Sequence, residues 1–273
     1  MPGSGQAIKL GPMILAADNI TASRPSLRRA LRERDGGFIA DLCRRLAAAG
    51  ADWLDLNPGY LSPAARAETW RFLVGTAEAA CDLTLMLDAA EPAELELALG
   101  FCTRPPVLNM ATAQEARLGP VLDLAAHHGL SLVAAAMTAS VPASSEERLA
   151  LAALIVQEAA RRGISGQRLI IDPMVMPLAL PGGEAQAAAV LQVLRALPQV
   201  FDPPPVRLIA LSNLTTATAG ARASFAAGPF LAAAWGAGLE VALLDVLDPA
   251  LHKMLRLLNV FAGRGVFAPG EFV

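Results

Sequence analysis

Carboxylate and amide side chains stand at the ends of short apolar runs in this chain. Asp88 ends a run that is otherwise nearly all apolar, Asp172 ends another, and Asn109 and Asn213 follow two more. A carboxylate accepts hydrogen bonds, whereas an amide both donates and accepts them. If these four groups met at one place, they could hydrogen-bond a flat ring that presents mixed donors and acceptors.

The apolar runs themselves number eight, and a segment with helical character separates each from the next. Alternation of this kind predicts an α/β fold, a (β/α)8 barrel, in which the C-terminal ends of the strands form the catalytic face. We expect a single domain over residues 1–273, with its core at about 13–262. The runs predicted as strands are Met13–Ala17, Trp53–Leu56, Leu83–Leu87, Pro106–Leu108, Leu132–Met137, Leu169–Ile171, Val206–Leu211 and Val241–Leu244.

The polar strand ends favour a heterocycle such as a pterin or a purine over a phosphate or a metal. Each residue alone has an ordinary structural explanation, such as a helix cap, a turn-forming Asn or an Asx turn before proline. None of the three histidines lies at a strand end, which argues against a zinc site or a Ser-His-Asp triad. The lysines are Lys9 and Lys253, so a Schiff-base enzyme is disfavoured. A cation between Asp88 and Asp172 is conceivable, but their neighbours are apolar or small.

Composition excludes several broad classes of protein. Hydrophobic residues make up 54% of the 273, but no uncharged run is long enough to predict a transmembrane helix. The net charge is −3 without a basic stripe, which argues against nucleic-acid binding. Cys43, Cys81 and Cys102 lack disulfide or zinc spacing, so we expect free thiols and a cytoplasmic location.

Several motifs in the same order and spacing resemble the methyltetrahydrofolate:corrinoid methyltransferases. They are also similar to the folate-binding module of cobalamin-dependent methionine synthase, and both are pterin-binding barrels. The resemblance covers about residues 13–260. It rests on the stretches Ser26–Asp35, Gly50–Gly59, Leu83–Asp88, Val107–Asn109, Leu169–Pro177, Leu211–Asn213 and Ala232–Pro249.

The resemblance implies roles for individual residues. Asp88, Asn109 and Asp172 would hydrogen-bond the pterin ring, and Asn213 would approach N5 of the folate. Further residues would belong to the same site. They are Asp55 and Asn57 in the Asp-Leu-Asn signature, Ser212 beside Asn213, Asp18 in place of a family glutamate, and Arg222 as a counterpart of a loop arginine.

The implied reaction is methyl transfer between N5 of methyltetrahydrofolate and the cobalt of a corrinoid (cobalamin), in one direction or the other. The folate, as methyltetrahydrofolate or tetrahydrofolate, would be a substrate, and a separate protein would carry the corrinoid. The resemblance also implies a homodimer.

The chain departs from the family pattern beside the predicted site. Ala89, Ala90 and Glu91 follow Asp88, and Met110 follows Asn109, where the family usually has hydroxyl or amide side chains. Three alternatives therefore stay open: a non-catalytic folate- or corrinoid-binding barrel, a dihydropteroate synthase-like enzyme, and a barrel enzyme for an unrelated heterocycle. Against the synthase, the seventh strand ends in Leu-Ser-Asn-Leu-Thr without a lysine.

Overall fold

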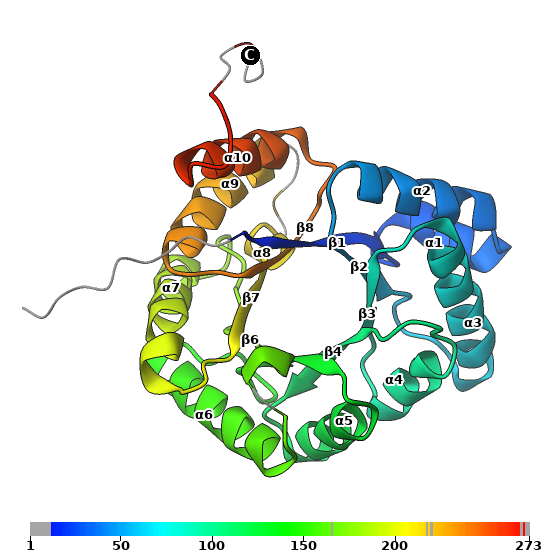
Figure 1. Cartoon of the computed structure of the whole chain (residues 1–273), viewed down its shortest axis with the longest axis horizontal. Helices are drawn as coiled ribbons and strands as arrows, with labels where there is room; N and C mark the ends of the chain where they lie inside the picture. Colours follow the sequence, from blue (N-terminus) through cyan, green and yellow to red (C-terminus); the bar gives the residue numbers. More distant parts are fainter. Residues whose placement is uncertain (1–11, 165, 217, 219–220, 268–269, 271–273) are drawn as a thin grey trace, which may run out of the picture.

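Eight parallel strands close into one barrel inside a ring of helices, which confirms the predicted (β/α)8 fold (Figure 1). The computed structural model describes residues 12–164, 166–216, 218, 221–267 and 270. Every strand pairs with its sequence neighbours, and β1 pairs with β8 to close the barrel. The strands are β1 (Ile14–Thr21), β2 (Trp53–Asn57), β3 (Thr84–Asp88), β4 (Val107–Thr112), β5 (Ser131–Ala135), β6 (Leu169–Asp172), β7 (Val206–Ala210) and β8 (Val241–Leu244).

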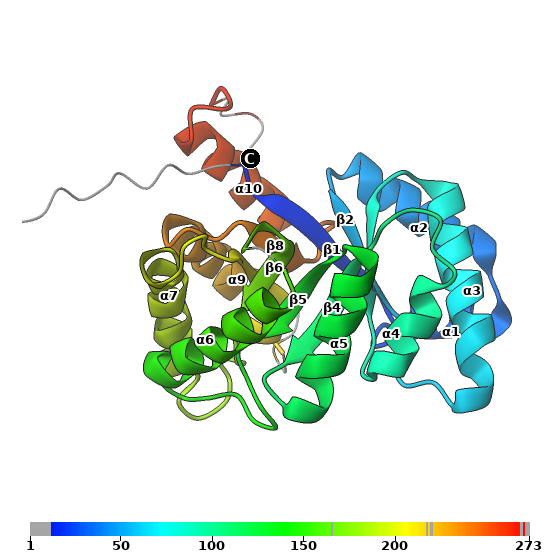
Figure 2. The same ribbon diagram turned by 60° about the horizontal axis from the view of Figure 1, so that its bottom comes forward.

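Helices cover the outside of the barrel (Figure 2). In the described ranges none of them is both long enough and apolar enough to cross a membrane. They are α1 (Pro25–Glu33), α2 (Gly36–Ala48), α3 (Pro63–Ala80), α4 (Pro92–Leu99), α5 (Glu115–His128), α6 (Ser145–Arg161), α7 (Gly183–Val200), α8 (Leu211–Leu214), α9 (Ala221–Gly236) and α10 (Pro249–Phe261), with a short 3-10 turn, η1 (Gly166–Arg168), before β6.

Local signals fix where these helices begin and end. Proline occupies the first turn of α1, α3, α4 and α10, where its missing N–H costs no helical hydrogen bond. The Ser144 side chain caps α6 by accepting a hydrogen bond from Glu147 N, and Asp248 caps α10 in the same way. Gly129, in the left-handed conformation, ends α5. These signals set where the helices begin after the strands of the C-terminal face.

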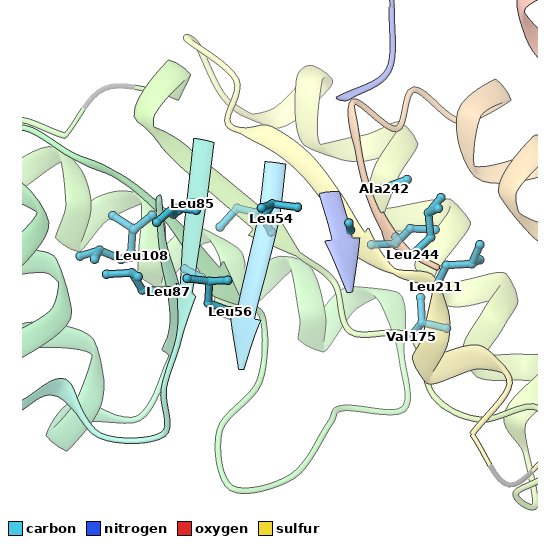
Figure 3. Packing of buried hydrophobic residues seen from close by; sticks show 14 of the residues in the cluster. Leu54, Leu56, Leu85, Leu87, Leu108, Val175, Leu211, Ala242 and Leu244 are labelled. Atoms are coloured by element: carbon cyan, nitrogen blue, oxygen red, sulfur yellow. The ribbon is translucent and has the colours of Figure 1, made fainter. Parts of the chain in front are cut away.

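The strands bury both faces, in two separate apolar layers. Leu54 and Leu56 of β2 belong to the large outer layer, which includes Leu85 and Leu87 of β3 and packs against the helices (Figure 3). Because side chains alternate along a strand, Asp55 points to the opposite side, into the barrel. The smaller layer inside the barrel consists of Ala16, Met86, Val107, Val133, Ile170, Leu208, Ala210, Val241 and Leu243.

Two strands run further than the sequence predicted. Asp18 lies within β1 and Asn109 within β4, so the prediction that both follow strand ends was wrong. In each strand the pairing register shifts close to the polar residue, between Ala17 and Ile20 in β1 and between Asn109 and Ala111 in β4. Such an irregularity turns a side chain locally while the strand continues beyond it, and periodicity alone does not reveal it.

The segment after β7 also differs from its prediction. The predicted strand extends to Leu211, but β7 ends at Ala210 and α8 follows it directly, so both Ser212 and Asn213 lie within a helical turn. Small and hydroxyl-bearing residues favour loops when they are judged one by one. Here Leu211 and Leu214 are buried and hold the single turn against the barrel.

Candidate functional site

A cavity of about 520 Å³ opens at the C-terminal end of the strands. The structure brings eight of the nine predicted site residues into its lining; the ninth is Arg222, whose side chain lies outside the described residues. The lining consists of Asp18, Thr21, Ser23, Arg24, Asp55, Asn57, Asp88, Asn109, Met110, Asp172, Met174, Leu208, Ala210, Ser212, Asn213, Thr216 and Leu243.

Two carboxylate–amide pairs form one wall of the cavity. Asn57 Nδ2 donates to Asp88 Oδ2 at 2.6 Å, and Asn109 Nδ2 donates to Asp55 Oδ1 at 3.2 Å. Asp88 and Asn109 are also register partners on neighbouring strands. Each amide therefore orients an acid, so the Asp-Leu-Asn signature, the end of β3 and Asn109 within β4 make a single polar surface.

Burial changes the protonation of these acids. It raises the pKa of Asp55 well above its ordinary value, and the nearby negative charge of Asp88 raises it further. Burial also raises the pKa of Asp88 to about 6, although the hydrogen bond from Asn57 and the positive charge of Arg117 oppose that rise. Protons are thus retained in the cavity close to neutral pH, and the acids need not all be ionised together.

Arg117 of α5 supports this wall from behind. Its Nε donates to Met110 O and its Nη2 to Ala89 O, each at 2.8 Å. These carbonyls belong to two positions at which the sequence departs from the family pattern. A guanidinium therefore holds the residue after β3 and the middle of β4 where hydroxyl or amide side chains are missing. Sequence reasoning missed Arg117, and its only signal was a cation in the first turn of the helix after Asn109.

Asp172 faces this wall from β6 and is almost completely buried. Its Oδ1 accepts a hydrogen bond from Met174 N at 2.8 Å, in an Asx turn across Pro173. Met174 adopts a positive φ of 62°. Burial raises the pKa of Asp172 to about 7, while the Met174 N–H and the charge of Arg148 lower it. The structural explanation of the Asp-Pro pair holds, and the same carboxyl group lines the cavity.

Asp18 occupies the side of the cavity near β8. Burial raises its pKa, which a hydrogen bond with the Ser212 side chain partly offsets. Its Oδ1 is buried without a hydrogen-bond partner among the described residues and lies 3.9 Å from Arg24 Nη2. Arg24 in turn donates to Asp245 Oδ2 at 2.8 Å. At the wall of the cavity, Asp18 therefore keeps one carboxylate oxygen without a hydrogen bond from the part of the chain that the structure describes.

Asn213 lines the cavity from α8, at the rim, and is partly exposed. No loop separates β7 from this helix, so the backbone that carries Asn213 is fixed to the end of the strand. Its neighbour Ser212 is exposed and reaches Asp18 across the mouth. An amide at an open rim can meet both a bound ring and a second reactant above it.

This set of groups fits an organic ring better than an ion. No cluster of three or more metal-ligating side chains occurs in the part of the chain that the structure describes. The volume lies within the usual range for small-molecule sites, about 300–1,000 Å³. Carboxyl groups that are partly protonated, together with oriented amides, can accept and donate hydrogen bonds along the edge of a heterocycle.

Comparison with known proteins supplies a relative. Over 169 residues the chain is 26% identical to the methylcorrinoid:tetrahydrofolate methyltransferase of Eubacterium limosum. The matched region covers 61% of this chain and 62% of that protein. This chain is similar to a methylcorrinoid:tetrahydrofolate methyltransferase. The similarity confirms the resemblance drawn from the motifs. No protein-family model matches the chain.

Solved structures with the same architecture include two dihydropteroate synthases. The enzyme of Xanthomonas albilineans, in complex with 7,8-dihydropteroate, is 19% identical with a TM-score of 0.65, and the match covers 92% of this chain and 93% of that one. The enzyme of Stenotrophomonas maltophilia, with imidazole bound in its active site, is 16% identical with a TM-score of 0.68, over 94% and 96% of the two chains. At these identities the likeness establishes the barrel fold alone.

Proposed function

We propose that this protein transfers a methyl group between N5 of methyltetrahydrofolate and the cobalt of a corrinoid carried by a partner protein. The observation that supports it most is the cavity, in which the motif residues of five strands and α8 meet. The similarity to a methylcorrinoid:tetrahydrofolate methyltransferase supports the choice of substrates. The homodimer and the cytoplasmic location stay predictions.

The carboxyl groups of the cavity would bind the pterin ring. A pterin carries an amino group and a ring N–H side by side, and one carboxylate can accept from both. Asp172 is suited to this role because it is buried and held by the Met174 N–H. Asp88 and Asn109 would meet the opposite edge of the ring, oriented by Asn57 and Asp55. Orientation of this kind supplies much of the catalytic effect in a displacement reaction.

Asn213 would act at N5, where the bond between nitrogen and the methyl carbon breaks or forms. When methyl leaves N5, the cobalt supplies the electron pair of the new bond, and the electrons of the N–C bond stay on nitrogen, which takes up a proton. A tertiary amine is a poor leaving group, so a hydrogen bond at N5 that strengthens in the transition state would speed the step. In the reverse direction N5–H loses its proton as the methyl group arrives.

Calorimetric titration with tetrahydrofolate and methyltetrahydrofolate tests the first half of this proposal. We expect micromolar binding, with strong weakening in Asp172→Ala. The second half is tested by mixing the protein and methyltetrahydrofolate with free cob(I)alamin, or tetrahydrofolate with methylcobalamin, while recording the visible spectrum of the corrinoid.

Each alternative predicts a different result. Folate binding without corrinoid methylation or demethylation would favour a non-catalytic binder. Turnover of dihydropterin pyrophosphate with 4-aminobenzoate would favour the synthase. Absence of binding to either folate would mean that the barrel serves another ligand, and the proposal would fall.

A further inference from the structure

Arg148 of α6 is a charged side chain with no exposed surface. Its Nη2 donates to Gln186 Oε1 of α7 at 2.6 Å and to Met174 O at 3.4 Å, and its Nη1 reaches Ala143 O at 3.5 Å. Its Nε is buried without a partner among the described residues. No motif in the sequence singles out this arginine.

A buried guanidinium is costly unless a negative charge compensates it. No carboxylate in the described ranges lies within 4.0 Å of the guanidinium nitrogens of Arg148. The negative charges that act on it are those of Asp172 and Glu147. Glu147 is exposed, so solvent weakens its effect, whereas Asp172 is buried at the cavity. Asp172 is therefore the internal counter-charge of Arg148.

A chain of contacts joins the two residues. Gln186 holds the guanidinium, the guanidinium meets the Met174 carbonyl, and the Met174 N–H binds Asp172 Oδ1. Met174 has a positive φ. Residues other than glycine seldom adopt this backbone conformation, and they keep it when the surrounding structure holds them there. Arg148 thus acts on the geometry of the turn and on the charge of the acid together.

We propose that Arg148 is a positioning residue for Asp172: it fixes the turn after β6 and favours the ionised, hydrogen-bond-accepting form of the carboxyl group. The role deepens the proposed function, because a pterin offers N–H donors to that carboxylate, and a protonated acid would set a donor against them. The residue itself touches no substrate.

Other charged groups face the same cavity. Asp18, Asp55 and Asp88 line it from β1, β2 and β3, and the negative charges of Asp88 and Asp18 raise the pKa of Asp55. Arg24 stands near Asp18, and Arg117 stands behind Asp88. Among the arginines whose side chains the structure describes, Arg148 is the one whose charge lowers the pKa of Asp172.

Carboxyl ¹³C NMR titration of the whole protein, with Asp172→Asn identifying the resonance, measures the midpoint of Asp172 without any ligand. We expect a midpoint near the value of about 7 in the wild type. In Arg148→Met it should rise by about one pH unit or more, because a nearby cation is lost. Arg148→Lys should return it toward the wild type, since it restores the charge. Arg162→Met, directly after the end of the same helix, is the control: Arg162 pairs with Asp123 and Glu158 at the surface, and its loss should leave the midpoint unchanged.

Gln186→Glu provides a second route if Arg148→Met does not fold. The new carboxylate would pair with the guanidinium and cancel its effect on Asp172, so the midpoint should again rise. An unchanged midpoint in the folded Arg148→Met protein overturns the proposal, as does an unchanged midpoint in Gln186→Glu should Arg148→Met fail to fold.

Methyltetrahydrofolate titrations across pH supply a functional readout. In Arg148→Met the affinity should fall several-fold at neutral pH and recover as pH rises through the new midpoint, whereas a merely destabilised site would bind weakly at every pH. A shifted midpoint in a protein that binds no folate would sustain the role of Arg148 and reject the proposed function, so the two can fail separately.

Discussion

At the scale of single residues, the cavity holds acids in surroundings that favour their neutral forms. Asp172 illustrates the consequence, because its pKa rises from 3.8 to about 7 on folding. A raised pKa means that the folded state binds the proton more tightly than the unfolded state does. The stabilising contribution is complete below pH 3.8 and is lost as the pH rises through about 7. The site therefore lowers the stability of the protein at and above neutral pH.

Replacing Asp172 by Asn should remove this penalty. We expect Asp172→Asn to be more stable than the wild type at pH 8, by up to a few kcal/mol at roughly 1.4 kcal/mol per pKa unit. The gain should shrink as the pH falls toward 5. Urea unfolding at a series of pH values measures it, and Asp88→Asn should gain less, because the pKa of Asp88 rises only to about 6. A gain of equal size at every pH would show that the proton of Asp172 is not responsible.

Asn213 should matter to the reaction more than to binding. Asn213→Ala should lower the rate of methyl transfer roughly 10²- to 10³-fold, the usual cost of removing one donor that acts in a transition state. Methyltetrahydrofolate affinity should change little, because the interaction with N5 strengthens only as the bond breaks. Single-turnover kinetics with cob(I)alamin, alongside calorimetry, separate the two effects. Asp172→Ala is the comparison and should lose mainly affinity. Equal losses of rate and affinity in Asn213→Ala would contradict this role.

At the scale of elements, the eight runs predicted the strands because buried parallel strands are uniformly apolar. The polar residue types predicted that Asp88, Asn109, Asp172 and Asn213 would meet, since the ends of the strands of a barrel share one face. The structure confirms their meeting in one cavity. Their roles in binding and catalysis stay predictions.

The supporting arginines could not be predicted in the same way. Arg117 and Arg148 lie on helices, among many arginines whose guanidinium groups face solvent. Their importance depends on which carbonyls their side chains reach, and those contacts join residues that are far apart in the sequence. Arg148 bonds to Gln186, 38 positions away. Local sequence patterns do not predict such long-range contacts, just as they did not predict the shifts of pairing register in β1 and β4.

The hydrogen bonds from Arg117 of α5 to the carbonyls of Ala89 and Met110 can be tested by replacing Arg117. In Arg117→Met the carbonyls of Ala89 and Met110 lose their donors, and hydrogen bonds to charged groups contribute about 1.5–3 kcal/mol each. We expect methyltetrahydrofolate to bind at least tenfold more weakly, and the pKa of Asp88 to rise because Arg117 lowers it.

Arg104→Met is the matched control for that experiment. Arg104 donates to the carbonyl of Cys81 in the loop before β3, at the end of the barrel away from the cavity. Its loss should lower stability and leave folate affinity unchanged. If calorimetry shows equal affinity in the two variants, the effect of Arg117 is general destabilisation.

At the scale of the whole molecule, the two apolar layers of the barrel have different structural roles. The outer layer joins strands to helices and contains most of the buried residues. The inner layer fills the barrel below the cavity. Met86 belongs to the inner layer, two positions before Asp88 on β3 and in register with Asp55. We therefore expect the inner layer to set the height and tilt of the acids, and the outer layer to set stability without influence on them.

Met86→Ala and Leu73→Ala compare the two layers directly, because both wild-type side chains are completely buried. Each variant should lose about 2–5 kcal/mol of unfolding free energy, the usual cost of such a cavity. Only Met86→Ala leaves space beneath Asp55 and Asp88, so only this variant should also lose methyltetrahydrofolate affinity, by tenfold or more. Leu73 lies on α3, against the outside of the barrel, and its loss should leave binding intact. Urea unfolding and calorimetry at one pH measure both quantities. If the two variants bind the folate equally well, the acids are held by their hydrogen bonds alone and not by the packing beneath them.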